Sequence, residues 1–188
     1  MAVSETATQE LPGAKPPDAP CEMLEAKLWA NPCPFAFRLN YLALLYNTPL
    51  YDWIREAYGL SRPEYVVLYS LALADGSSAR DVSRTSGFPK NTLSRGINRL
   101  EAMGLIEARS KAPGGGRTQA LHLSRRGWDL FHETCPAFEA LETRMLAVLT
   151  QGERQMLSEL LSKVVLAATE LADTPPIETR GRKAGNAE

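Results

Sequence analysis

The chain has 188 residues, of which 44% are hydrophobic, 23% are charged and 7% are aromatic, and its formal net charge is −1. This length corresponds to one domain of about 150 residues with extra segments, and it excludes two independent enzyme domains. No apolar run reaches the roughly 20 residues that cross a bilayer, and the first residues do not have the pattern of a signal peptide. We therefore expect a cytoplasmic protein without membrane contact.

The few residues able to bind metals or form disulfides are scattered along the chain. Cysteine occurs at Cys21, Cys33 and Cys135, without C-x-x-C spacing, and the two histidines are His122 and His132. This pattern favours neither a disulfide framework nor a zinc site. No paired carboxylates, nucleophile with a base, or phosphate-binding loop is recognisable, so we expect no enzyme, no metal and no cofactor.

Positive charge is concentrated in the middle of the chain. Between Gly76 and Gly127 ten lysine or arginine residues stand against three acidic ones, so this segment carries +7 and the rest carries −8. This layout is typical of a compact nucleic-acid-binding lobe on a scaffold that is not itself basic. Charge alone fits an ordinary solvated surface equally well.

The N-terminal part is predicted to contain an arm and one long helix. The first 20 residues are rich in proline and poor in large apolar groups, and Cys21–Ala30 fits a short helical turn. We assign residues 1–34 to a disordered or short helical arm. Residues 35–60 form the first helix of a dimerisation domain, which runs from about Phe35 to Tyr58 and stops at Gly59.

Capping patterns then predict three helices in succession. Ser61 with Glu64 starts a helix that runs to Gly76, and Ser78 with Asp81 starts a short helix that ends at Gly87. A further helix over about Lys90–Met103 has apolar residues on one face only. The last two helices and their short turn predict a helix-turn-helix, with the second helix as the reader of DNA.

After Gly104 the spacing of apolar residues changes from about 3.6 residues, which is typical of a helix, to about 2 residues, which is typical of a strand. Alternation over Leu105–Arg109 and again over Ala120–Ser124 predicts a β-hairpin with a glycine-rich loop from Lys111 to Arg117. A helix-turn-helix followed by a projecting hairpin is a winged helix. We assign residues 61–127 to this DNA-binding lobe.

Two long amphipathic stretches follow Gly127, and Pro136 is expected to kink the first. The apolar stripes are Trp128, Phe131, Cys135, Phe138, Leu141, Met145 and Val148 in one, and Leu157, Leu160, Leu161, Val164, Val165, Ala168 and Leu171 in the other. A small winged lobe cannot cover both stripes, so we expect residues 128–173 to form dimerisation helices and residues 174–188 a disordered tail. The predicted fold is mainly α, in the α+β sense, with a winged lobe and a helical dimerisation domain.

The order of these elements resembles that of the MarR family of bacterial transcriptional regulators over about Phe35–Asp173. Gly59–Leu68 is similar to the family's second-helix signature, Asn91–Ile106 to its recognition helix, and Leu121–Gly127 to the end of its wing. The wing of the family usually carries an Asp two residues before an Arg, whereas here Gly115 precedes Arg117. We therefore expect a looser wing and a less ordered Arg117.

The start of the predicted recognition helix carries the residues expected to contact DNA. Arg95 is the first choice for reading bases, because its guanidinium can bond both O6 and N7 of guanine. Lys90 and Arg99 suit phosphates, while Thr92 and Ser94 suit phosphates or bases. The full set of expected DNA contacts is Lys90, Asn91, Thr92, Ser94, Arg95, Arg99, Lys111 and Arg117. The alternative is that the hydroxyls satisfy local backbone groups and the arginines are solvated.

The resemblance also implies a small-molecule effector, often a phenol or an aromatic carboxylate. Arg38 suits a carboxylate by bidentate pairing, and Tyr41, Tyr69 and His132 are expected to line the cavity. An inter-subunit salt bridge is an equal alternative for Arg38. Core positions are the alternative for the two tyrosines, and an interface position is the alternative for His132.

The leading interpretation is a homodimeric, MarR-like repressor that binds a pseudo-palindromic operator in double-stranded DNA. Half-sites about 10 base pairs apart are expected, with release by a small aromatic or phenolic acid and residence on the nucleoid when the protein is bound. One alternative is a thiol-based redox sensor of the same fold that uses Cys33 or Cys135. The other is a winged-helix module that docks a protein instead of DNA.

Overall fold

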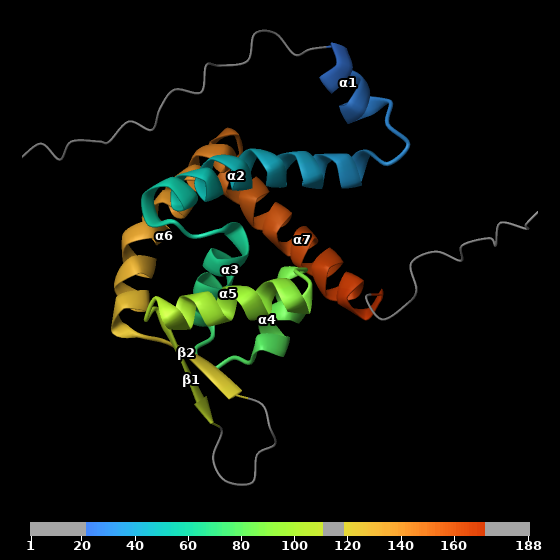
Figure 1. The fold of residues 1–188 in the computed structure, drawn as a ribbon. Coiled ribbons are helices and arrows are strands. Elements are labelled where there is room, and N and C mark those ends of the chain that lie inside the picture. Colours follow the sequence, from blue (N-terminus) through green and yellow to red (C-terminus); the bar gives the residue numbers. More distant parts are fainter. Residues whose placement is uncertain (1–21, 111–118, 172–188) are drawn as a thin grey trace, which may run out of the picture. The chain divides into compact units, whose positions relative to one another are not determined.

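The computed structural model describes residues 22–110 and 119–171, and Figure 1 shows the course of the chain. Two compact units, Met1–Arg125 and Arg126–Glu188, are distinguished by the contacts within each. The described residues form α1 (Glu22–Trp29), α2 (Pro34–Tyr58), α3 (Arg62–Leu73), α4 (Ala79–Ser86), α5 (Lys90–Ala102), β1 (Ile106–Ser110), β2 (Gln119–Leu123), α6 (Arg125–Met145), a 3₁₀ turn (Leu146–Val148) and α7 (Gln151–Leu171). The predicted fold class, mainly helical with a small antiparallel wing, is confirmed.

Helix α2 begins and ends close to the residues that the sequence predicts. Pro34 occupies its first turn, where a missing N–H costs no hydrogen bond, and the helix continues through Pro49. It ends at Tyr58, and the Gly59 N–H donates to the Arg55 carbonyl at 3.0 Å. The apolar residues at its C-terminal end, Leu50 and Ile54, are buried.

Helices α3, α4 and α5 form the core of the first unit. The Ser61 N–H donates to Glu64 Oε2 at 2.7 Å at the start of α3, and the Ser78 N–H donates to Asp81 Oδ2 at 3.1 Å at the start of α4. Figure 1 shows α5 lying across α3, with α4 at its N-terminal end. The buried core residues come from all three helices: Tyr65, Val67, Leu68, Leu71, Val82, Leu93, Ile97 and Leu100.

The wing strands pair in antiparallel register, with Ile106 opposite Leu123 and Ser110 opposite Gln119. The turn between α3 and α4 is hydrogen-bonded to β2, because the Gly76 N–H donates to the Leu121 carbonyl and the Leu121 N–H donates to the Ser77 carbonyl. The prediction that α3 continues to Gly76 is wrong by three residues, since Gly76 has a φ of +81° and pairs with β2 instead.

Asp75 fixes this turn to β2 through its side chain. Its Oδ1 accepts the Leu123 N–H at 3.1 Å, and its Oδ2 lies 2.8 Å from His122 Nδ1. A Cβ on Gly76 would lie 3.2 Å from His122 Cε1, so glycine suits this position for space as well as for φ. The wing is thus joined to the helix-turn-helix by backbone and side-chain bonds.

The second unit contains α6 and α7. Helix α6 begins at Arg125, before the predicted start after Gly127, and continues through Pro136 to Met145. Helix α7 has Val164 46%, Leu160 51% and Val165 60% exposed. No helix within residues 22–110 and 119–171 is long and apolar enough to span a membrane. The functional roles assigned above to the segments of the chain remain predictions.

Candidate nucleic-acid interface

The predicted recognition helix α5 has one buried face and one exposed face. Leu93 and Leu100 are at most 1% exposed and Ile97 is 7% exposed, because this face packs on α3 and α4. Gly96 lies on the same face, where a Cβ would be 3.4 Å from Glu64 Cγ and 3.7 Å from the Glu64 backbone. The glycine therefore marks a close approach of α5 to the first turn of α3.

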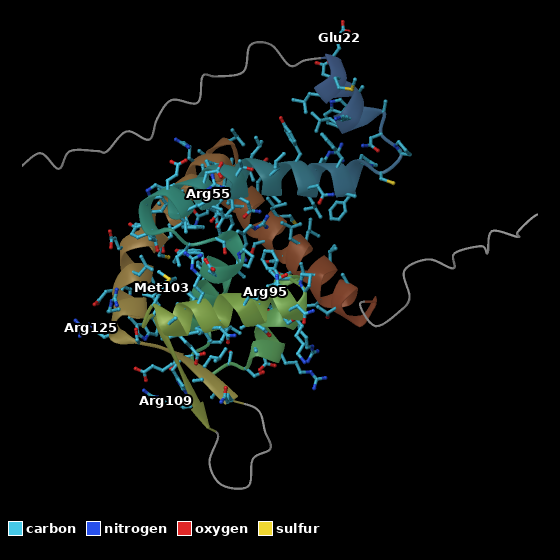
Figure 2. All side chains as sticks on the ribbon, viewed as in Figure 1. Glu22, Arg55, Arg95, Met103, Arg109 and Arg125 are labelled. Atoms are coloured by element: carbon cyan, nitrogen blue, oxygen red, sulfur yellow. The ribbon has the colours of Figure 1, made fainter. Side chains whose placement is uncertain are left out.

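The polar residues at the N-terminal end of α5 lie on the exposed side. Lys90, Asn91, Ser94 and Arg95 are exposed, and Thr92 is half-buried. Within the described part of the chain, the side chains of Lys90, Asn91 and Arg95 make no hydrogen bond or ion pair. Figure 2 labels Arg95 on α5. These donors are available to an external partner.

The electrostatics of this end suit an anion. The unpaired N–H groups of a helix N-terminus and the helix dipole both attract negative charge. Exposed Arg80 and Arg84 on neighbouring α4 add to the charge of Lys90 and Arg95. The arrangement can hold phosphates with α4 and the start of α5 while α5 presents side chains to base edges.

Arg99 lies one turn beyond Arg95, but its guanidinium has partners within the protein. Its Nη1 lies 3.1 Å from both carboxylate oxygens of Glu64, and its Nη2 donates to the Gly59 carbonyl at 2.9 Å. Sequence reasoning assigned Arg99 to phosphates and missed this contact, because the partners are 35 and 40 residues away. A local signal for this contact is Gly96, because a glycine inside a helix costs stability and is consistent with a close approach of another backbone.

Of Arg109, Lys111 and Arg117 in the predicted wing, only Arg109 lies within the described part of the chain. Arg109 on β1, labelled in Figure 2, is exposed and pairs with Glu107 at 3.0 Å. Lys111 and Arg117, the two expected wing contacts, lie outside the described residues. Their contact with DNA stays a prediction, as does the looser wing expected from Gly115.

Arg62, for which the sequence predicts no role, also joins α2 to the helix-turn-helix. The guanidinium carbon of Arg62 lies 5.1 Å from the ring centroid of Tyr51 on α2 and 5.7 Å from that of Phe88. Phe88 lies in the turn just before α5. Burial raises the pKa of Tyr51, and the charge of Arg62 partly counteracts this effect.

The effector candidates on α2 are engaged by neighbouring residues. Arg38 Nη2 donates to the Leu28 carbonyl at 2.6 Å, and its guanidinium carbon lies 5.2 Å from the ring centroid of Trp29. Tyr41 is exposed and stacks on Phe37, with ring centroids 5.5 Å apart. Helix α1 thus supplies the partners of Arg38, which is half-buried.

The other two effector candidates lie elsewhere. Tyr69 is half-buried on α3, with its ring centroid 6.4 Å from that of Tyr65. His132 is exposed on α6 in the second unit. Its ring centroid lies 5.7 Å from that of Trp128 and 5.8 Å from that of Phe131. A common pocket for the four effector candidates stays a prediction.

The two cysteines proposed for redox sensing differ in environment. Cys33 is exposed and immediately precedes α2, whereas Cys135 is half-buried in α6. Burial raises the pKa of the Cys135 thiol, and the nearby Glu139 carboxylate, whose Oε1 is 3.6 Å from Sγ, raises it further. Because the thiolate is the reactive form, this environment disfavours redox chemistry at Cys135.

Comparisons with known proteins agree with this geometry. Residues 58–118 match the sequence profile of the MarR family. The HTH-type transcriptional repressor Rv2887 of Mycobacterium tuberculosis is 27% identical over 106 residues, which are 56% of this chain and 76% of that protein. The structure of Rv2887 in complex with salicylic acid is also similar. The structural match covers 72% of this chain and 98% of the Rv2887 chain, with a TM-score of 0.57 and 22% identity.

Two other solved structures are similar. A MarR-family transcriptional regulator from Silicibacter pomeroyi is 25% identical, with 84% of this chain and 99% of that chain covered and a TM-score of 0.65. A putative MarR-family regulator from Listeria monocytogenes, complexed with 26-mer DNA, is 20% identical. The match covers 71% of this chain and 87% of that chain, with a TM-score of 0.65. The profile match falls on the helix-turn-helix, and the structural match extends through most of the chain. Residues 58–118 are therefore similar to the MarR family in sequence, and the fold of the chain is similar to that of solved MarR-family transcriptional regulators.

Proposed function

We propose that this regulator is a homodimeric repressor that binds a pseudo-palindromic operator through α5 and leaves it when a small aromatic or phenolic acid binds. Its similarity to DNA-binding transcriptional regulators supports a regulator and not an enzyme. We place its action in the bacterial cytoplasm, on the nucleoid when it is bound to DNA.

The observation that carries the proposal is the free N-terminal end of α5. Lys90, Asn91 and Arg95 are exposed without intramolecular partners in the described part of the chain, while the opposite face of the helix is buried. Insertion of this end into the major groove brings Arg95 to base edges and Lys90 to phosphates. Asn91, Thr92 and Ser94 supply further donors and acceptors at the same end. The Listeria monocytogenes structure shows that a protein of this fold binds DNA.

A second copy of the chain is the proposed cover for the exposed apolar residues. Helix α7 exposes Leu160, Val164 and Val165, and the N-terminal half of α2 exposes Leu42 and Leu45 at 51% and 49%. Apolar surface of this extent is characteristic of an interface. A two-fold dimer would present two copies of α5 to two half-sites.

The proposed effector is an aromatic carboxylate or a phenol, as supported by the salicylic acid bound to Rv2887. Arg38, Tyr41, Tyr69 and His132 are the proposed contacts. Because Arg38 is held by the Leu28 carbonyl and Trp29, a carboxylate would have to replace these partners. The effector acts only if its affinity is higher for the form that does not bind the operator.

Footprinting of the full chain on the DNA upstream of its own gene tests the proposal. The reactions contain no addition, salicylate, 4-hydroxybenzoate or, as a non-aromatic control, acetate. We expect a symmetric protected site that an aromatic acid abolishes and acetate does not. Diffuse coating without a site would contradict the operator claim, and a site insensitive to every aromatic acid tested would contradict the effector claim.

A further inference from the structure

Arg99 makes the most connected side-chain contact described for α5. Its guanidinium forms a fork, with Nη1 3.1 Å from Glu64 Oε1 and Oε2 and Nη2 2.9 Å from the Gly59 carbonyl. Glu64 lies in the first turn of α3, and Gly59 is the residue that caps α2. One side chain of the recognition helix therefore touches the end of α2 and the start of α3.

Glu64 is a buried acceptor that needs this partner. Its side chain is 8% exposed, whereas that of Arg99 is 53% exposed. Glu64 Oε2 also accepts the Ser61 N–H at 2.7 Å, which caps α3. A carboxylate so poorly hydrated requires a positive partner, and Arg99 supplies it.

Backbone packing supports the same contact. The Glu64 N and Cα atoms lie 3.7 Å from the position of a Cβ on Gly96, so α5 meets α3 closely at Glu64. The charged fork and the helix crossing coincide at one residue. Such a contact limits both rotation of α5 about its axis and sliding of α5 along α3.

We propose that Arg99 is a positioning residue, which sets the depth and rotation of α5 by binding Glu64 and the Gly59 carbonyl instead of a DNA phosphate. The inference rests on the proposed function, because its consequence is the presentation of Arg95 and Asn91 to base edges. It also gives α2 a direct polar connection to the recognition helix. A shift at the C-terminal end of α2 is thereby carried to α5.

Three variants separate a positioning role from a phosphate contact. Arg99→Lys keeps the charge for a phosphate but loses the planar fork that reaches Glu64 and Gly59 together. Glu64→Gln removes the buried partner, which weakens operator binding if Arg99 positions α5 but leaves it equal or tighter if Arg99 contacts DNA. Glu101→Gln is the matched control, because it removes an exposed carboxylate from α5 without touching the fork.

The test measures operator affinity by fluorescence anisotropy against salt concentration, for the wild type, each variant and the double variant Glu64→Gln/Arg99→Lys. We expect each of Glu64→Gln and Arg99→Lys to weaken specific binding about tenfold, with the double variant no weaker than the worse single variant. The salt dependence and the binding of scrambled DNA stay at wild-type levels, and Glu101→Gln binds at least as tightly as the wild type. Wild-type affinity in Arg99→Lys together with equal or tighter binding in Glu64→Gln would overturn the proposal.

Amide hydrogen exchange of the DNA-free protein tests the positioning contact without any operator. Faster exchange in α5 and the first turn of α3 in both Glu64→Gln and Arg99→Lys is the expected result, and unchanged exchange in both overturns the inference. If the wild type finds no operator but exchange responds as expected, the proposed function fails while the positioning contact stands.

Discussion

Helices α5 and α7 are both amphipathic in sequence, but their apolar faces differ in how far they are exposed in the structure. In α5, Leu93, Ile97 and Leu100 are at most 7% exposed because α3 and α4 of the same chain cover them. In α7, Leu160 and Val165 are 51% and 60% exposed. The face available for recognition is consequently polar in α5 and apolar in α7.

This difference indicates two kinds of partner. A helix whose apolar face is satisfied internally offers charge and hydrogen bonds, which suits DNA. A helix whose apolar face remains exposed gains free energy by association with another apolar surface. The same 3.6-residue periodicity thus predicts a helix in both places, and only burial shows which apolar face is covered by other described residues.

The largest expected effect comes from a charge on the α7 stripe. Leu157→Asp should convert the dimer to a monomer and weaken operator binding about a hundredfold, because a monomer engages one half-site only. Sedimentation equilibrium and anisotropy measure the two effects. Leu166→Asp is the control, since it lies nine residues away on the opposite side of the helix and is 69% exposed. Equal behaviour of the two variants would contradict dimerisation through this stripe.

Removal of the proposed base-reading side chain should have the next largest effect. Arg95→Ala is expected to weaken operator binding about tenfold or more while binding to scrambled DNA is largely kept, because a bidentate contact to guanine discriminates between bases. The ratio of the two affinities, measured by anisotropy, is the relevant quantity. A uniform loss on both DNAs would assign Arg95 to a phosphate instead.

The packed side of α5 gives a smaller prediction about stability. Gly96→Ala should raise the free energy of unfolding by about 0.5–1 kcal/mol, because alanine favours helix and its Cβ would meet Glu64 Cγ at an ordinary 3.4 Å. Gly96→Leu should lower it by about 1–3 kcal/mol, since the larger side chain must displace Glu64. Urea unfolding distinguishes the two directions. Stabilisation by leucine would show that α5 is not closely packed there.

The smallest expected effect concerns the bond between the wing and the helix-turn-helix. Burial raises the pKa of Asp75, but the bonds from His122 and the Leu123 N–H and the charges of His122 and Arg109 outweigh it, so the pKa lies below its ordinary 3.8. A lowered pKa stabilises the folded state above pH 3.8, and this contribution is lost as pH falls through the folded value. The difference in urea midpoint between wild type and Asp75→Asn should therefore shrink below pH 3.8.

Asp52→Asn is the control for this titration, because Asp52 is a carboxylate in an exposed pair with Arg55 on α2. A wild-type to Asp75→Asn difference that stays constant from pH 5 to pH 3 would mean that Asp75 does not stabilise the wing through its charge.

Local signals predicted the elements well where they act within a few residues. Ser61 with Glu64 and Ser78 with Asp81 mark the starts of α3 and α4 correctly, since a capping box is complete within one turn. The end of α3 was misplaced because the Gly76 N–H pairs with Leu121, 45 residues later, and no local pattern contains that bond.

The candidate site shows the same limit. Composition and helix position identified the exposed end of α5, because exposure there follows from periodicity. The partner of Arg99 was not predictable, since Glu64 and Gly59 lie on other elements and are brought to α5 by tertiary packing. The attachment of Arg38 to α1 was missed for the same reason.

Selection from a pool of random double-stranded DNA tests most directly whether α5 of a dimer reads an operator. The purified wild type is predicted to enrich an inverted repeat with half-sites about 10 base pairs apart. Arg95→Ala is predicted to keep that spacing but to lose its preference at one base pair in each half-site. Enrichment of no symmetric sequence by the wild type, or of the same bases by both proteins, would contradict the account.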